Sequence, residues 1–525
     1  MTPAELATLI AGRWSDAARP RPAGTGVLEV DCAPAALPAV CGALFREWEL
    51  RFAGLYVEDE GGEWRLRYVF YGGGADGWVH VLSALPRAQR TLPSIAGPVH
   101  AADWHERETE DLFGLVFEGH PRLGDFVLHD DAWPEGVAPM RRSVDGRART
   151  TDRRAAAEAR PRRLVQAPGA FVLPVGPVFA ALAESAHFQL ETVGEDVIRA
   201  FPRLFYKYRA VEKIAEGRRA DDVLLLAERF AATTALAHAL AYSRAVEAVT
   251  GTPVPARAEA LRIFLAELER FRHHVGAVAG ICESTALAVA TSQAAILEER
   301  LLRASGTLAR HRYLMGAVVP GGLALDLEDA ACAVALGECR EVLAGTDRLW
   351  EMLRLSSSFL DRIEEVGVIA ARDARDHGLV GPIARASGAG GDLRALQPYG
   401  GYARLSFFPA HEREGDGYAR LRVLFTEMRQ SVRLMEQIGA DLPPGPVRAP
   451  VAWREGAALG WVEAPRGAAF HWVRLNADGS VRRYRVVPPS FANWHGFHLA
   501  VENFAFQDFP IILATLDLSV AENDR

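Results

Sequence analysis

Apolar and polar residues alternate over short runs in the first part of the chain, up to about Leu123. Alternation with a period of two is typical of strands with one buried face. Strands are therefore expected at Gly26–Val30, Arg51–Val57, Trp64–Tyr71 and Trp78–Leu85, and a helical pattern covers Leu37–Trp48. These elements predict a small α+β domain over residues 1–135.

Apolar residues recur at helical spacing from Phe171 onward. One helix is expected to begin at Asp221 or Asp222 and to end at Gly251, ahead of Pro253. Further helices are expected over Ala256–Val278, Thr291–Tyr313, Glu328–Ala344 and Arg348–Glu365, before strand-like alternation returns over Ala449–Val487. Several long helices joined by short loops predict a bundle with a small sheet over residues 171–525. The fold class of the whole chain is α+β.

Between these two parts, residues 136–170 are rich in Arg, Ala and Pro and contain few large apolar side chains. A segment of this composition cannot contribute much to a core. We therefore expect a linker here.

The most apolar window, Val275–Leu297, carries Glu283 and many small residues, which favours a buried bundle helix over a membrane span. The first residues, Met1–Arg13, lack the basic and apolar regions of a signal peptide. Any membrane attachment is therefore expected to come through partner subunits.

The composition excludes some function classes. Fifty-nine Lys and Arg residues against 67 Asp and Glu residues give a net charge of −8, with mixed signs along the chain, so nucleic acid is not an expected partner. The five cysteines form no CxxC pair, which argues against a disulfide framework and against an iron–sulfur or zinc site made by this chain alone. A reducing compartment fits best.

Histidines occur as neighbours at His273 and His274, within a predicted helix. Adjacent helical residues point about 100° apart, so the pair cannot hold one metal ion as i, i+4 histidines do. We expect one of the two in the core and the other toward solvent.

A long charged motif runs from His105-Glu106-Arg107-Glu108 through Asp111 to Leu112-Phe113-Gly114, followed by Gly119-His120-Pro121. It resembles the signature of the C-type hydrophilic subunit of respiratory complex I and of related hydrogenases. Its charged residues suit a clamp on a neighbouring subunit, or equally ion pairs inside the domain. The candidate docking residues are Glu106, Arg107, Glu108, Asp111 and His120.

The second part contains a series of short motifs with charged, histidine, Gly and Pro residues. They are Gly176-Pro177, Glu184, His187-Phe188, Glu228-Arg229, His238, Gly381-Pro382, Arg385-Ala386-Ser387-Gly388, Asp392, Arg394, Glu463-Ala464-Pro465-Arg466-Gly467 and Asp508-Phe509-Pro510. In this order they resemble the large catalytic subunit of energy-converting nickel–iron hydrogenases of formate hydrogenlyase type, and the D-type subunit of complex I. The resemblance covers nearly the whole chain and implies fused C-type and D-type parts.

Two thiolate pairs hold nickel and iron in that hydrogenase family. Their positions here are occupied by Ala231 and Thr234, and by Ser519 and Glu522. Because soft metals need sulfur ligands, a nickel–iron centre of the family type is not expected. A harder ion held by Thr234, Ser519, Glu522 and His238 is a minor alternative, since only Glu522 is a strong oxygen ligand.

The complex I relatives use the same cavity for quinone, which the resemblance implies is held by a histidine and a tyrosine. Those positions are Phe179 and Ala232 in this chain. Neither offers a hydrogen-bond donor. A repurposed cavity that binds quinone or another apolar ligand, with substitutes such as His187, His238 or Tyr242, remains an alternative.

The charged residues of the family motifs are nevertheless retained. They and two histidines are the candidate cavity or coupling residues: Glu184, His187, Arg229, His238, Arg385, Asp392, Arg394, Glu463 and Arg466. If buried, the charges must be paired. They are expected to form either an ion-pair lattice that holds the fold together or a network that passes protonation and conformational changes to partners.

The resemblance implies the hydrophilic large subunit of a complex-I-related, membrane-associated oxidoreductase or hydrogenase-like assembly. Its own catalytic centre is expected to be lost, with iron–sulfur clusters on a small partner subunit. Other partners would be antiporter-like membrane subunits, which would hold the chain on the cytoplasmic side of the inner membrane. The alternative is a redox subunit that reduces quinone or another acceptor.

Overall fold

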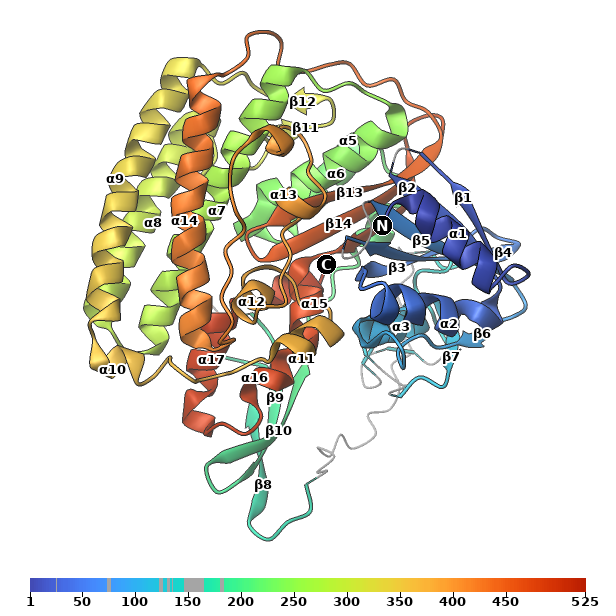
Figure 1. The fold of residues 1–525 in the computed structure, drawn as a ribbon, viewed down its shortest axis with the longest axis horizontal. Helices are drawn as coiled ribbons and strands as arrows, with labels where there is room; N and C mark the ends of the chain where they lie inside the picture. Colours follow the sequence, from blue (N-terminus) through green and yellow to red (C-terminus); the bar gives the residue numbers. More distant parts are fainter. Residues whose placement is uncertain are drawn as a thin grey trace. The chain divides into compact units, whose positions relative to one another are not determined.

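A computed structural model describes residues 1–24, 26–72, 77–121, 126–129, 133–134, 136–145, 165–179 and 184–525. The described residues form two compact units, one within Met1–Arg162 and Asp376–Gly378, the other within Arg163–Arg375 and Leu379–Arg525. Figure 1 shows both with their elements labelled. Much of the predicted linker, residues 146–164, lies outside the described residues, so its proposed boundaries stay a prediction.

The first unit is built on a five-stranded sheet of order β1-β2-β5-β4-β3. Its strands are β1 (Ala18–Pro22), β2 (Val27–Cys32), β3 (Arg51–Asp59), β4 (Glu63–Tyr71) and β5 (Trp78–Pro86). The four predicted strands are confirmed. Within this sheet, β2 and β5 pair in parallel, and the backbone of Gly77 meets Gly26 where these two strands start. A Cβ at Gly77, whose φ is +118°, would lie 2.2 Å from the Gly26 carbonyl oxygen, so only glycine fits there.

Helices complete the first unit. The predicted helix over Leu37–Trp48 appears as α2 (Leu37–Gly42) and one π-helical turn, Ala43–Glu47. The remaining elements are α1 (Pro3–Arg13), η1 (Pro34–Ala36), β6 (Thr91–Pro93), η3 (His100–Ala102), α3 (Asp103–Phe113) and β7 (Val116–Glu118).

The second unit contains the predicted bundle. Its long helices are α7 (Ala256–Ser284), α8 (Ala288–Ala309), α9 (Asp329–Arg354) and α14 (Gly417–Ala440), which lie side by side in Figure 1. The break predicted near residues 344–348 is wrong, because α9 continues through it. Gly345 lets α9 approach α8 closely: a Cβ there would lie 2.6 Å from Leu297.

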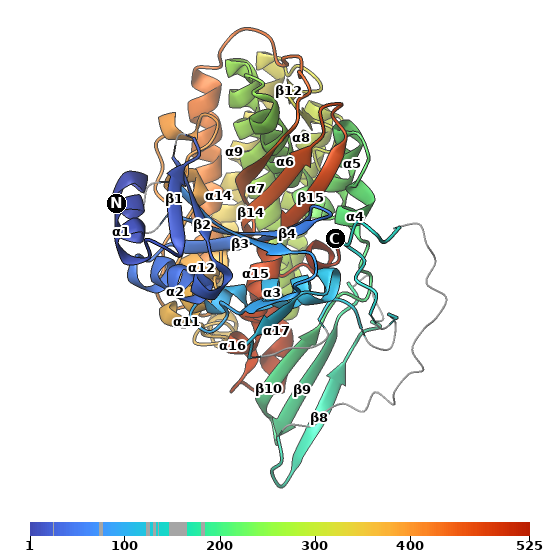
Figure 2. The same ribbon diagram turned by 90° about the vertical axis from the view of Figure 1, so that its right-hand side faces the viewer.

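A sheet of β13 (Gly456–Ala464), β14 (Gly467–Leu475) and β15 (Val481–Val487) confirms the predicted C-terminal strands. Helix α6 (Ala235–Thr250) lies against it, and a Cβ at Gly460 would come within 2.0 Å of the Ala241 carbonyl oxygen. A second sheet, β10-β9-β8, projects from this unit in Figure 2 and was not predicted. Its strands are β8 (Ala170–Val175), β9 (His187–Val193) and β10 (Asp196–Arg203).

Shorter elements connect these parts. They are α4 (Val211–Ala215), α5 (Ala220–Arg229), η4 (Ala232–Thr234), β11 (Val318–Val319), β12 (Gly322–Leu323), α10 (Ser357–Leu360), α11 (Ala371–Asp376), α12 (Gly381–Ala386), α13 (Leu393–Leu396), η5 (Tyr402–Arg404), α15 (Pro489–His495), α16 (Phe497–Val501), η6 (Phe506–Asp508), α17 (Phe509–Leu516) and α18 (Val520–Asn523).

Among the described residues, no single helix is both long and apolar enough to cross a membrane. The bent pair Ala220–Arg229 and Ala232–Thr250 meets the criteria of length and composition together, with a bend of 111° between its halves.

Candidate functional site

The helix predicted from Asp221 to Gly251 is interrupted at the first pair of family ligand positions. Helix α5 stops at Arg229, and α6 starts only at Ala235. Glu269 of α7 accepts the N–H groups of Leu236 (2.8 Å) and Ala237 (3.0 Å), which fixes the start of α6. Ala231 and Thr234 therefore lie in a buried turn between two helices, a position that helical periodicity alone did not reveal.

The second pair of positions lies at another chain turn. Helix α17 ends at Asp517, whose φ of 47° is left-handed, and Ser519 is the N-cap of α18. The Ser519 hydroxyl accepts the N–H of Glu522 at 3.3 Å and donates to the Glu184 carboxylate at 3.2 Å. The Ser519 hydroxyl thus uses its proton and one lone pair in hydrogen bonds that stabilise this turn.

The two pairs of positions come together through Glu522. Thr234 Oγ1 donates to Glu522 Oε1 at 3.2 Å, Ser490 N–H donates to Oε2 at 3.0 Å, and Arg466 lies 3.4 Å from Oε1. Burial opposes ionisation of this carboxyl, but His238 and Arg466 outweigh it and lower its pKa to about 2. Glu522 is therefore a carboxylate tied to the protein around it.

This donor set does not fit a nickel–iron centre. Ala231 has no ligand atom, the hydroxyl protons of Thr234 and Ser519 are donated to carboxylates, and the Arg466 cation shares an oxygen of Glu522. Neutral hydroxyls and a carboxylate are poor ligands for soft metals. The same Arg466 contact opposes binding of a harder cation at Glu522.

A chain of buried rings extends from this turn toward β14 and β15. His238 Nδ1 lies 3.0 Å from His471 Nε2, and His471 Nδ1 lies 2.9 Å from the Tyr484 hydroxyl. Burial, followed by the neighbouring His238, lowers the pKa of His471 well below its usual value. His238 Nε2 lies 3.9 Å from Glu522 and has no hydrogen-bond partner among the described residues.

Two of the candidate substitutes for a quinone-binding pair already donate to or pair with the backbone. His187 pairs through Nδ1 with the Gly176 carbonyl at 3.1 Å, and the Tyr242 hydroxyl donates to the Ala220 carbonyl at 2.8 Å. At the family positions themselves, Phe179 follows β8 and is half-buried, and Ala232 is exposed. Quinone binding by substitute residues stays a prediction.

The retained charges divide into separate groups. Arg385, Asp392, Arg394 and Glu463 lie together in the core of the second unit, where sequence predicted paired charges. Arg466 pairs with Asp517 at 3.2 Å, which also contacts His273 Nε2 at 2.6 Å.

Glu184 and Arg229 depart from the prediction of a buried network, because both side chains are exposed. Arg229 pairs with the adjacent Glu228, which is buried. Glu184 caps α18 through Ser519 and the N–H of Val520.

Sequence reasoning missed several members of the buried network. Glu267 of α7 contacts the predicted Arg394, and Glu427 of α14 contacts the predicted Arg385. Arg270 of α7 lies beside both of these added carboxylates. The sequence pattern gave no clear signal for them, because polar residues along a long helix are typical of its solvent face. His273 and His274 are both buried, so the expectation that one faces solvent is wrong.

In the first unit, the predicted docking residues are largely internal. Glu106 is fully buried and accepts hydrogen bonds from Ser94 Oγ (2.5 Å) and the Ile95 N–H (2.9 Å). His120 lies 3.3 Å from the Asp103 carbonyl oxygen, and Glu108 is buried too. The prediction of a docking surface is wrong for Glu106, Glu108 and His120, because buried side chains cannot clamp a neighbour.

Arg107 and Asp111 are only half-buried. Arg107 stacks on the Phe126 ring at 4.6 Å, and Asp111 accepts three backbone N–H groups of residues 126–128. A role of these two in docking stays a prediction.

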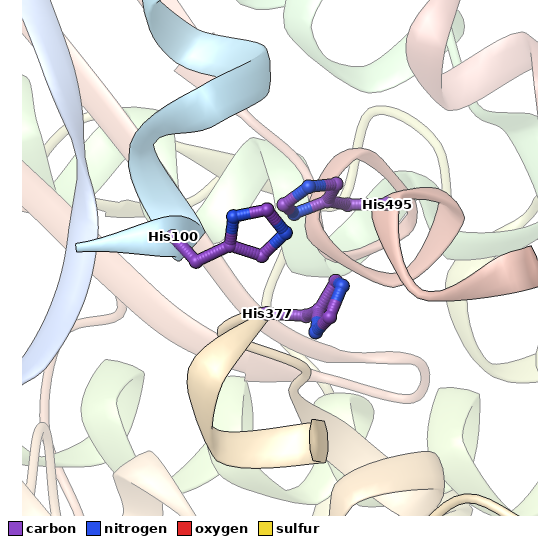
Figure 3. A group of neighbouring side chains, drawn as sticks. All are labelled: His100, His377 and His495. Carbon is purple, nitrogen blue, oxygen red and sulfur yellow. The ribbon is translucent and has the colours of Figure 1, made fainter. Parts of the chain in front are cut away.

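Elsewhere in this unit His100 and His377 pack edge to face, with ring centroids 4.4 Å apart (Figure 3). His495, also labelled in Figure 3, belongs to the second unit.

Two family models match the chain. The respiratory-chain NADH dehydrogenase 30 Kd subunit matches residues 30–150, and the 49 Kd subunit matches residues 289–454 and 448–525. The chain belongs to this complex I and hydrogenase subunit family. Its fused 30 Kd-type and 49 Kd-type parts confirm the resemblance and the α+β fold class inferred from sequence.

Relatives of the family include proteins of both kinds. Formate hydrogenlyase subunit 5 of Escherichia coli K12 is 30% identical over 463 residues, covering 85% of this chain and 79% of that protein. Hydrogenase-4 component G of the same organism is 30% identical over 500 residues (93% and 86%). The C/D fusion protein of the NADH-quinone oxidoreductase of Bdellovibrio bacteriovorus is 29% identical over 468 residues (81% and 81%).

Proposed function

We propose that the chain is the hydrophilic large subunit of a complex-I-related assembly and acts there in assembly and coupling, without a nickel–iron centre of its own. The observation that carries the proposal is the Thr234–Glu522 hydrogen bond, which joins two family ligand positions to each other. A thiolate pair at such positions would face a metal, whereas here a carboxylate faces Arg466.

The expected partners follow from the names of the relatives, which are subunits of hydrogenase and NADH-quinone oxidoreductase complexes. A small iron–sulfur subunit would carry the electron-transfer clusters. Antiporter-like membrane subunits would hold the assembly on the cytoplasmic side of the inner membrane. Reduction of quinone or another acceptor is the alternative function.

Elemental analysis tests the absence of the centre. The native assembly, purified in mild detergent, is expected to contain no stoichiometric nickel per copy of this chain, and iron only in amounts explained by partner clusters. Nickel at one atom per chain would overturn the proposal. Recovery of the chain as a lone species from the same membranes would overturn the assembly role separately.

A matched pair of variants sharpens the test. Thr234→Ser keeps the hydroxyl donor to Glu522, and Thr234→Val removes it. If the turn is a structural joint, Thr234→Val lowers stability while Thr234→Ser does not, and neither changes the metal content. A change in bound metal with either variant would contradict the proposal.

A further inference from the structure

A dense group of charges lies in the core of the second unit, between α7, α12, α13, α14 and β13. Its members are three arginines, Arg270, Arg385 and Arg394, and four carboxylates, Glu267, Asp392, Glu427 and Glu463. Each of these side chains is at most 1% exposed. We call this set the core charge cluster.

The signs in the core charge cluster do not balance. Three guanidinium groups face four carboxyl groups, which leaves one negative charge if every acid is ionised. Guanidinium groups do not lose their protons in proteins, so they cannot adjust. An uncompensated charge is costly at full burial. The structure therefore calls for one further positive charge.

The pairing pattern shows where the surplus lies. Arg394 contacts both Asp392 (2.7 Å) and Glu267 (3.0 Å). Arg385 is shared between Glu427 (2.7 Å) and Glu463 (2.7 Å) and lies 3.8 Å from Asp392. Arg270 is 3.3 Å from Glu267 and 3.9 Å from Glu427. Glu427 and Glu463 share Arg385, and the Glu463 carboxylate has no second arginine within 4 Å among the described residues. The surplus negative charge therefore lies at this pair of carboxylates.

A histidine lies beside this pair of carboxylates. His274 Nε2 lies 2.8 Å from Glu427 Oε2, and the side chain is 1% exposed. Its Nδ1 is buried and has no hydrogen-bond partner among the described residues. The adjacent His273 contacts Asp517 instead, so only one of the two neighbours joins the core charge cluster.

We infer that the core charge cluster is a proton-binding site that holds one proton at neutral pH, on His274 or on Glu463. The ligand is a proton, and the site is formed by residues at five separate elements, α7, α12, α13, α14 and β13. The inference does not depend on the absence of nickel and would hold if the proposed function failed.

The surroundings favour Glu463 over His274 as the place of this proton. For Glu463, burial and then Asp392 raise the pKa, against the opposing charge of Arg385. For His274, burial lowers the pKa, Arg270 adds to this, and Glu427 and Asp517 only partly oppose it, so the net shift of the pKa is downward. A protonated His274 would also carry a buried Nδ1–H donor with no acceptor among the described residues.

Spectroscopy on the full chain tests the inference directly. Imidazole nitrogen resonances of the histidine-labelled protein distinguish neutral from protonated rings, and His274→Asn assigns the signal. Infrared difference spectra between wild type and Glu463→Gln report a protonated carboxylic acid. We expect either a protonated His274 or a carboxylic acid band, and either one disappears in Glu463→Gln, because that variant has three carboxylates for three arginines.

The inference is overturned if His274 is neutral and the infrared difference spectrum between wild type and Glu463→Gln shows no carboxylic acid band. The wild-type imidazole spectrum remains informative if Glu463→Gln does not fold. Nickel content tests the proposed function and leaves this result untouched, so the two can fail independently.

A stability comparison gives a second measurement. Glu247 forms a balanced buried pair with Arg262, at 2.5 Å. Glu247→Gln leaves an unpaired arginine and is expected to raise the unfolding constant on the order of a hundredfold or more. Glu463→Gln removes the surplus acid, so its effect is expected to stay below about tenfold. Equal effects of the two variants would count against a surplus charge.

Discussion

Glu522 joins the two pairs of family ligand positions, and the role of its charge can be tested by a single substitution. Glu522→Gln keeps the shape of the side chain and removes its charge. The carboxylate has three close partners, Thr234, Ser490 and Arg466, and none of its surface is exposed. The variant therefore leaves the Arg466 cation with Asp517 as its remaining partner.

The expected magnitude follows from the pKa of this carboxyl, which falls from 4.5 to about 2. A shift of one pKa unit corresponds to about 1.4 kcal/mol, so ionisation of Glu522 stabilises the fold by about 3 kcal/mol near neutral pH. Because the pKa of Glu522 is lower in the folded state than in the unfolded state, this stabilisation is complete above pH 4.5. It is lost as pH falls from 4.5 toward about 2.

Urea unfolding followed by far-ultraviolet circular dichroism measures the effect, since the long helices belong to the second unit. The gap between wild type and Glu522→Gln is expected to be about 3 kcal/mol near neutral pH and to narrow below pH 4.5. A gap that is below about 1 kcal/mol, or does not change with pH, would refute the reasoning.

Glu299 is the matched control. Hydrogen bonds from Arg312 and Arg303 lower its pKa to about 2 as well, but its side chain is 38% exposed. Water and salt screen such pairs, so Glu299→Gln should change stability little. A large effect of Glu299→Gln would show that burial is not what separates the two sites.

Two other predictions concern packing and pH. Burial, against hydrogen bonds from Ser94 and Ile95, raises the pKa of Glu106 from 4.5 to about 8. The stability of the first unit should therefore fall as pH rises from 4.5 through about 8, and Glu106→Gln should remove that slope in urea titrations. Gly460→Ala should destabilise the contact of α6 with β13 by more than about 1 kcal/mol, whereas Gly337→Ala, with open space in α9, should stabilise by up to about 1 kcal/mol in thermal unfolding.

Sequence patterns predicted the strands of the first unit and the long helices of the second because each follows a simple apolar period. These patterns did not predict a helix boundary that depends on a residue distant in the sequence. The break before α6 depends on Glu269, which caps the helix from α7. Asp221 and Asp222 only occupy the first turn of α5, and they gave no sign of an interruption ten residues later.

The candidate site was predictable in its parts and not in its contacts. Motif residues such as Arg385 and Glu463 could be named, since the family resemblance carries them. Their partners Glu267 and Glu427 lie on long helices whose polar residues looked like ordinary surface positions. Helix α14, which supplies Glu427, was not predicted at all, and charge balance could only be counted once it was placed.

The Arg466 guanidinium is largely buried and needs an anionic partner. In the structure, Glu522 and Asp517 both serve it, at 3.4 and 3.2 Å. A neutral residue at position 522 would have left the Ser490 N–H and the Thr234 hydroxyl without their acceptor inside the core. A carboxylate supplies charge and two acceptors at once. The turn thus has a negative group at a position where the resemblance implies a thiolate in the hydrogenases, and this group pairs with the buried Arg466 cation.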